Sequence, residues 1–134
     1  MSDNIIIHLI SEAIKIRENA YSPYSNYCVG AAVLCGSGKI YTGCNVENAS
    51  YGLSCCAERN AVFNAVSHGE RVVKAVAIVG GHKDKDTEYA YPCGACRQVL
   101  NEFSDQDTMI YVARTKDDYK KYSMAELLPE SFKL

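Results

Sequence analysis

Apolar residues recur every three or four positions in four stretches of the chain, a spacing typical of amphipathic helices. These stretches are residues 4–20, 55–68, 93–103 and 124–128. Ser2 or Asp3 is a plausible N-cap for the first helix, and Gly69 follows the second at the position where helices commonly end. Pro129 ends the fourth, because proline cannot donate the next backbone hydrogen bond.

Short runs rich in β-branched and aromatic residues lie between these stretches and predict five strands. The runs are residues 28–35, 39–43, 72–80, 108–113 and 119–123. The third, VVKAVAIVG, is almost wholly apolar, as expected of a strand buried on both faces. The order α-β-β-α-β-α-β-β-α combines a leading hairpin with parallel crossovers. We therefore expect one domain, residues 1–134, folded as a three-layer α/β/α sandwich around a mixed sheet.

Composition narrows the function. The chain is 48% hydrophobic and 22% charged, with a formal net charge of -2. It lacks the excess of positive charge that nucleic-acid-binding proteins use, so we expect no nucleic-acid partner. No apolar run approaches the roughly 20 residues of a membrane span. The N-terminus also lacks the basic segment of a signal peptide, so we expect a cytoplasmic protein with no membrane partner. Its seven cysteines cannot all pair, which argues against a disulfide framework.

Two cysteine clusters stand at the predicted starts of helices. Cys56 lies near the start of the second helix, and Cys93 and Cys96 open the third, three residues apart and within reach of one ion. Helix N-termini stabilise thiolates, and zinc prefers sulfur and nitrogen ligands in a tetrahedron. Three thiolates leave a fourth position open, which is typical of a catalytic zinc. Glu58, in the same first turn as Cys56, is placed to move a proton at that site.

With these motifs the chain resembles the zinc-dependent cytidine deaminases, in their small homotetrameric, nucleoside-acting form. The similarity extends from residue 24 to residue 132 through five blocks in order. These are residues 29–32 (VGAA), 43–49 (GCNVENA), 56–59 (CAER), 92–98 (PCGACRQ) and 126–129 (ELLP). The spacing Cys-x-Glu followed by Pro-Cys-x-x-Cys is the signature of zinc deaminases, in which the glutamate is not a ligand.

The resemblance implies a complete reaction. Cys56, Cys93 and Cys96 hold one zinc ion, and zinc-bound hydroxide attacks the amino-bearing ring carbon while Glu58 shuttles protons. The products are uridine or 2′-deoxyuridine and ammonia, formed from cytidine or 2′-deoxycytidine in pyrimidine salvage. Arg59, adjacent to Glu58, is expected to donate to the thiolates and offset their negative charge, a hypothesis that Arg59→Ala tests through zinc retention and turnover.

The resemblance also implies a substrate pocket shared between the subunits of a homotetramer. Asn45 and Glu47 match the ribose-holding positions, and Ala49 and Tyr51 belong to the same loop. The backbone N–H of Ala57 fixes the base or the hydroxide. Phe132 matches an aromatic residue that completes the pocket, often from another subunit. The pair Tyr27-Cys28 departs from the common Phe-Pro: Tyr27 still stacks on the base, but its hydroxyl needs a partner.

Two other interpretations remain at this stage. A related deaminase acts on a nucleoside antibiotic such as blasticidin S, although Asn45 and Glu47 favour ribose recognition. A non-catalytic module would instead use Cys44 or Cys55 as the fourth ligand of a structural zinc site. Glu58 distinguishes the two kinds of site, because a structural zinc has no use for a neighbouring carboxylate.

Overall fold

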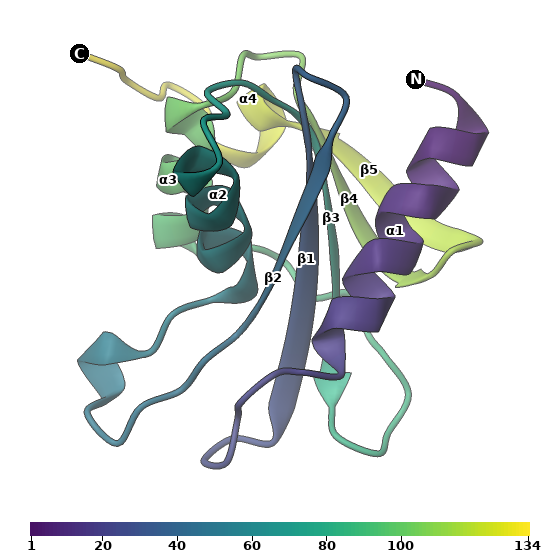
Figure 1. Ribbon diagram of the computed structural model, residues 1–134, viewed down its shortest axis with the longest axis vertical. Helices are drawn as coiled ribbons and strands as arrows, with labels where there is room; N and C mark the ends of the chain where they lie inside the picture. Colours follow the sequence, from purple (N-terminus) through teal and green to yellow (C-terminus); the bar gives the residue numbers. More distant parts are fainter.

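The protein is described by a computed structural model covering residues 1–134 (Figure 1). In chain order the elements are α1 (Asp3–Arg17), β1 (Tyr27–Cys35), β2 (Ile40–Cys44), the 3-10 helix η1 (Tyr51–Leu53), α2 (Ala57–Ser67), β3 (Val73–His82), α3 (Gly94–Glu102), β4 (Met109–Thr115), β5 (Asp118–Ser123) and α4 (Met124–Leu127). The predicted element order is confirmed, with η1 added inside the loop that the sequence left without regular structure.

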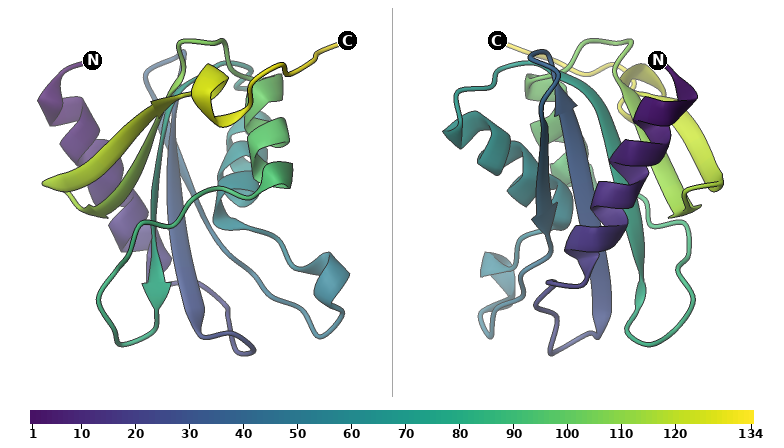
Figure 2. Two further views of the ribbon diagram at one scale, coloured as in Figure 1. Left: turned by 180° about the vertical axis from the view of Figure 1, so that it is seen from behind. Right: turned by 45° about the vertical axis from the view of Figure 1, so that its right-hand side comes forward.

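The five strands form one mixed sheet in the order β2-β1-β3-β4-β5. Only β3 and β4 pair in parallel, and the other neighbours are antiparallel. Helix α1 covers one face, and α2 and α3 cover the other (Figures 1 and 2). Each face has its own hydrophobic core, because alternate residues of β1 and β3 point to opposite sides. This is the expected three-layer α/β/α sandwich.

The first helix is shorter than its apolar pattern predicts. It begins as expected, with the Ser2 hydroxyl accepting a hydrogen bond from the Ile5 N–H, but it ends at Arg17 rather than at Ala20. The cause lies beyond the helix, because the Tyr21 N–H donates to the Asn45 carbonyl at 3.0 Å. That bond fixes the chain against the loop after β2, so the last predicted turn unwinds.

Two glycines let the helices approach the sheet closely. A Cβ on Gly30 would lie 2.1 Å from the Ala13 carbonyl oxygen in α1, and one on Gly43 would lie 2.3 Å from the Ala61 nitrogen in α2. Both distances are far below van der Waals contact, so each helix backbone packs directly on a strand. Because α2 carries Glu58 in its first turn, Gly43 sets how deeply that side chain enters the molecule.

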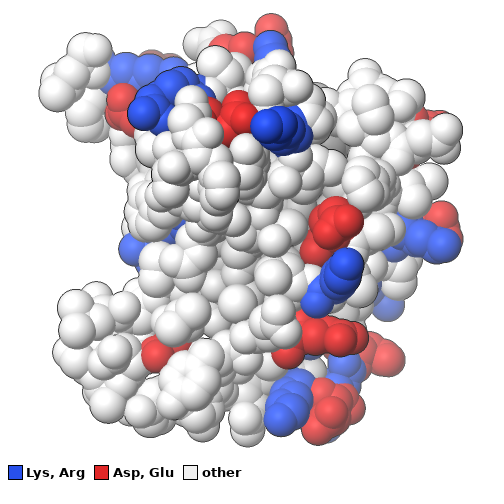
Figure 3. All heavy atoms as spheres, in the orientation of Figure 1, with Lys and Arg blue, Asp and Glu red and all other residues white.

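Charged side chains of both signs are interspersed over the face in Figure 3, mainly on the side of α1 and towards the termini. Much of the opposite side of that view is uncharged. Several large apolar side chains are exposed: Tyr51, Leu53 and Phe63 are 77%, 71% and 48% accessible, and Phe132 is 68% accessible. No helix in the structure has the length and apolar character needed to cross a membrane.

Candidate active site

The sulfur atoms of Cys56, Cys93 and Cys96 all lie within 4.8 Å of one another. Cys56 is the N-cap of α2 and Cys93 is the N-cap of α3, so the two helices direct their N-termini at the same point. The Cys96 N–H donates to the Cys93 sulfur at 3.4 Å. Helix N-termini attract negative charge, which favours the thiolate forms that bind metals.

This cluster fits a zinc ion. Cys56 Sγ and Cys93 Sγ are 3.9 Å apart, close to the roughly 3.8 Å that separates two sulfurs on a tetrahedral zinc with bonds of about 2.3 Å. Thiolates alone make up the set, and they leave one tetrahedral position free. Neither Cys44 nor Cys55 belongs to it, so a four-cysteine structural site is not supported.

Arg59 lies in the first turn of α2 and contacts the cluster. Its Nη2 donates to Cys56 Sγ at 3.5 Å, and its buried Nε has no hydrogen-bond partner within the protein. Hydrogen bonds from Cys96 and then from Arg59 lower the pKa of Cys56 to about 5. The hydrogen bond to Cys56, together with burial, raises the pKa of Cys96. The positively charged guanidinium beside Cys56 would offset part of the negative charge of a thiolate cluster.

Glu58 is the one buried acidic side chain of the protein, at 4% accessibility. It lies in the first turn of α2 and lines the same pocket as Cys56 and Cys93. Burial, and to a smaller extent the charge of Cys56, raises the pKa of Glu58 to about 7. A buried carboxyl group with no partner cation of its own is suited to exchange protons with a bound molecule.

The pocket beside the cluster has a volume of about 330 Å³, enough for a small molecule. Nine of its thirteen lining residues are hydrophobic, and the polar ones include Glu47, Asn45 and Glu58. The complete lining is Ser25, Tyr27, Val29, Asn45, Glu47, Cys56, Ala57, Glu58, Ile78, Tyr89, Ala90, Tyr91 and Cys93. The metal cluster and its carboxyl group therefore open into an apolar pocket with few polar groups, as in small-molecule sites generally.

Asn45 and Glu47 reach the pocket with much of their hydrogen-bonding capacity already used. The Asn45 amide accepts from the Val29 N–H and donates to the Tyr27 carbonyl, both at 2.8 Å. Glu47 accepts from the Ser25 hydroxyl at 2.6 Å and from two backbone N–H groups, and the hydroxyl contributes most to lowering its pKa. One amide N–H of Asn45 and the remaining lone pairs of an ionised Glu47 stay available to a ligand.

Tyr27 lines the pocket, and the Glu88 carboxylate influences its hydroxyl. Burial, and then the neighbouring Glu88 carboxylate, raise the pKa of Tyr27 to about 12. The ring also packs edge-on against His82, with centroids 5.0 Å apart. Sequence reasoning did not identify Glu88 as a neighbour of Tyr27, because Glu88 stands in a charged loop about sixty residues away along the chain.

Three predicted residues do not line this chain's own pocket. Ala49 and Tyr51 are exposed in and before η1, with Tyr51 packed edge-on against Tyr24 at 6.1 Å, and Phe132 is exposed in the C-terminal tail. Conversely, sequence reasoning missed Ser25 and the pocket wall formed by Tyr89, Ala90 and Tyr91. Proximity to the Pro-Cys-x-x-Cys motif was the only available signal for that wall.

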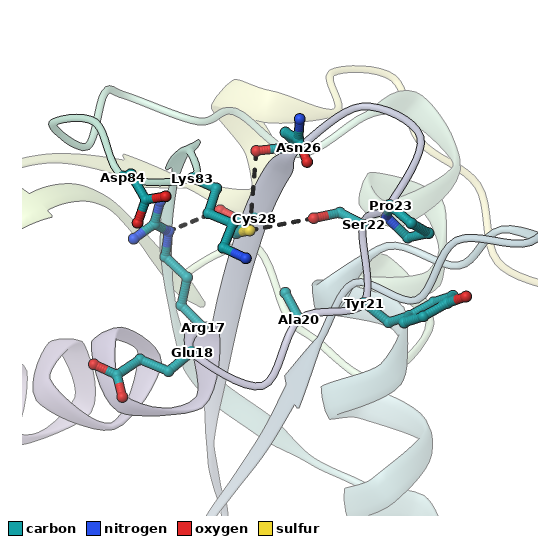
Figure 4. Close-up of a pocket in the computed structure, with 10 residues that line it drawn as sticks. All are labelled: Arg17, Glu18, Ala20, Tyr21, Ser22, Pro23, Asn26, Cys28, Lys83 and Asp84. Carbon is teal, nitrogen blue, oxygen red and sulfur yellow. Dashed lines mark hydrogen bonds between the residues drawn. The ribbon is translucent and has the colours of Figure 1, made fainter.

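A larger hollow of about 440 Å³ lies on the other side of β1 (Figure 4). There the Cys28 thiol is 3.2 Å from the Ser22 hydroxyl, and Arg17 Nε donates to the Cys28 carbonyl at 2.8 Å. Arg17 also donates to the Gly81 carbonyl, so it joins the end of α1 to two strands. The hollow contains no group of metal ligands.

A thiolate metal cluster at two helix N-termini, with a buried carboxyl group beside it in an α/β sandwich, defines a zinc-dependent enzyme of the deaminase class. The family model "Cytidine and deoxycytidylate deaminase zinc-binding region" matches residues 4–113. The chain therefore belongs to this family.

Named relatives cover nearly the whole chain. The cytidine deaminase of Halalkalibacterium halodurans is 48% identical over 124 residues, which is 92% of this chain and 91% of that protein. The cytidine deaminase of Sporosarcina psychrophila is 49% identical over 125 residues, covering 92% and 88%. The crystal structure of the cytidine deaminase of Burkholderia pseudomallei superposes with a TM-score of 0.85 at 42% identity, covering 98% of this chain and all of that one.

Proposed function

We propose that the protein hydrolyses cytidine and 2′-deoxycytidine to uridine and 2′-deoxyuridine with release of ammonia, a step of pyrimidine salvage. The observation that carries this proposal is Glu58, a buried carboxyl group that faces the same small pocket as Cys56 and Cys93. The relatives named as cytidine deaminases support the choice of substrate.

Each side chain of the site has a role in this reaction. Zinc, when held by Cys56, Cys93 and Cys96, supplies the Lewis acidity that makes water nucleophilic at neutral pH. Glu58 takes the proton of that water and gives it to ring nitrogen N3 of the pyrimidine. It then takes the proton of the new C4 hydroxyl group and delivers it to the exocyclic amino group, so that the C4 carbonyl forms as the C4–N bond breaks and ammonia leaves. No basic side chain lines the pocket to compete for these protons.

The remaining pocket residues hold the substrate. Glu47, ionised and fixed by Ser25, accepts from a ribose hydroxyl, and Asn45 contributes its free amide N–H. The first-turn N–H of Ala57 lies at the open end of α2, where it has no intrahelical partner and is free to bind the base. Tyr27, which lines the pocket, presents its ring to the base.

We further infer that the enzyme is a cytoplasmic homotetramer with shared active sites. The exposed apolar side chains of Leu53, Phe63 and Phe132 support burial against other subunits. Ala49, Tyr51 and Phe132 are absent from the pocket of their own chain, and a shared site is the arrangement in which they contact substrate. Sedimentation velocity checks the assembly, and a monomer active at full rate would contradict it.

The test is loss of the cytosine absorbance band when cytidine is added, with zinc content measured in parallel. Glu58→Gln is expected to retain one zinc per chain and to lose at least about 100-fold in kcat, because the proton carrier is gone. Glu102→Gln, exposed at the end of α3, is the matched control and keeps full activity. Undiminished turnover in Glu58→Gln would rule out the proposed role.

A further inference from the structure

The loop of residues 83–92, which joins β3 to α3, forms one wall of the pocket through Tyr89, Ala90 and Tyr91. It also leads directly to the metal-ligating Cys93. The loop contains no helix or full strand, and one bridge joins Glu88 to Gly80. A wall without regular structure needs other contacts to keep its shape.

Side chains along the wall alternate in direction. Ala90 is 8% accessible and points at β3, where a Cβ added to Gly80 would lie 2.6 Å from the Ala90 Cβ. The side chains of Tyr89 and Tyr91 instead contact β5, the edge strand of the sheet. Figure 2 shows the loop passing beside the β4–β5 hairpin on its way to α3.

The two tyrosines contact alternate residues of β5: Asp118, Lys120 and Tyr122. We call these three residues the β5 anchor. The Tyr89 hydroxyl donates to Asp118 Oδ1, and Lys120 Nζ lies 4.5 Å from the centre of the Tyr89 ring. The Tyr91 and Tyr122 hydroxyls are 3.2 Å apart, and their rings meet edge-on with centroids separated by 5.8 Å. The loop is thus attached to one strand by hydrogen-bonding, cation–π and aromatic contacts.

A third attachment lies just before the wall, where the Thr87 hydroxyl donates to the Arg114 carbonyl of β4 at 2.6 Å. Arg114 in turn contacts Asp118 at 3.6 Å, but both side chains are more than 40% accessible, so this ion pair stabilises little. Asp118 therefore acts on the loop mainly through the phenol of Tyr89.

We propose that Asp118 and Tyr122 are positioning residues for substrate binding: they fix the pocket wall of Tyr89 and Tyr91 without touching the substrate. This inference rests on the proposed function, because it concerns affinity for the nucleoside. A wall fixed before binding spares the substrate the entropy cost of ordering it. Such contacts act equally on substrate and transition state, so their loss raises KM and leaves kcat unchanged.

Asp118→Ala, which removes the acceptor for Tyr89, is the central variant. We expect its KM for cytidine to rise about fivefold, the worth of one hydrogen bond, with kcat close to that of the unaltered protein. Asp118→Asn loses the ion pair to Arg114 but keeps an oxygen acceptor, so its KM should stay near the original value. Asp117→Ala, on the exposed turn of the same hairpin, is the control for nonspecific effects.

Backbone amide hydrogen exchange in the absence of substrate provides an independent readout. Asp118→Ala and Tyr122→Phe should speed exchange in the loop of residues 83–92 and leave the core strand β3 protected. A double variant carrying Tyr89→Phe and Asp118→Ala should exchange in this loop no faster than Asp118→Ala alone, since both changes remove the same interaction.

The outcomes separate the two proposals. If the unaltered protein does not turn over cytidine, the proposed function fails, and hydrogen exchange still tests the anchor. Asp118→Ala with unchanged KM and unchanged exchange overturns the positioning role. A fall in kcat at constant KM also overturns it, because that result indicates a smaller folded fraction rather than a loosened wall.

Discussion

Replacing Gly43 by alanine tests whether the close packing of α2 on β2 determines the metal site. The new Cβ would lie 2.3 Å from the Ala61 nitrogen and 2.8 Å from the Ala57 carbonyl oxygen. Ordinary contact begins at 3.4 Å. Because the opposing atoms are helix backbone, no rotamer change relieves the clash, and α2 must move outward by about 1 Å.

That movement has two measurable costs. Overpacking of this kind destabilises a protein by about 1–3 kcal/mol, and the backbone clash places Gly43→Ala at the upper end. For a chain of this length, 3 kcal/mol corresponds to a fall of about 10 °C in Tm. Zinc sites tolerate errors of only about 0.2 Å in bond length, so moving Cys56 with α2 also weakens zinc binding.

The assay is thermal unfolding followed by circular dichroism, together with competition for zinc against a chelator of known affinity. Gly52→Ala is the matched control, because nothing lies within 4 Å of its new Cβ and its φ is not in the left-handed region. Equal Tm values and equal zinc affinities for the two variants would refute the packing argument.

Three further predictions concern stability. Asn45→Ala should lower the free energy of unfolding, measured by urea denaturation, by about 1–3 kcal/mol, because it leaves the Tyr27 carbonyl and the Val29 N–H unpaired. Asn45→Asp should recover the acceptor for Val29 alone. Calorimetry should give a Tm about 10 °C lower for the protein stripped of zinc by a chelator than for the protein in free zinc at 100 times its Kd. Burial, assisted by the charge of Glu70, raises the pKa of Cys35 from 9.0 to about 11. The unfolded chain therefore releases this proton first, and the free energy of unfolding falls as pH rises between those values. Cys35→Ala should show a shallower pH dependence of that free energy across the same window, and an equal slope in both proteins contradicts the assignment.

The sequence was informative wherever the signal was local. Helical and strand periodicities placed every major element, and the short spacing of Cys93 and Cys96 predicted that their sulfurs meet. Cys56 and Glu58 were candidates because they stand at the N-cap and in the first turn of a predicted helix. These features depend on residues close together in the chain, where backbone geometry limits the alternatives.

Contacts between distant segments were not predictable in the same way. The carboxylate that raises the pKa of Tyr27 belongs to Glu88, and the acceptor for the Tyr89 hydroxyl is Asp118. Each is an exposed or half-exposed side chain far along the chain. Nothing in the periodicity of a polar loop says which of its residues turns inward. The same limitation hid the second use of Asn45, whose amide joins the backbone of β1.

The electrostatics of the site connect Arg59 with Glu58. Zinc with three thiolates carries one net negative charge, and an ionised Glu58 beside it adds a second, so without compensation the carboxyl group would keep its proton. Arg59 offsets one of these charges through its bond to Cys56, and the N-termini of α2 and α3 together contribute about one more. We therefore expect the zinc-loaded site to be close to neutral with Glu58 ionised, the form that accepts a proton. We predict that the Arg59 guanidinium, which contacts Cys56, helps to keep the buried Glu58 carboxylate ionised.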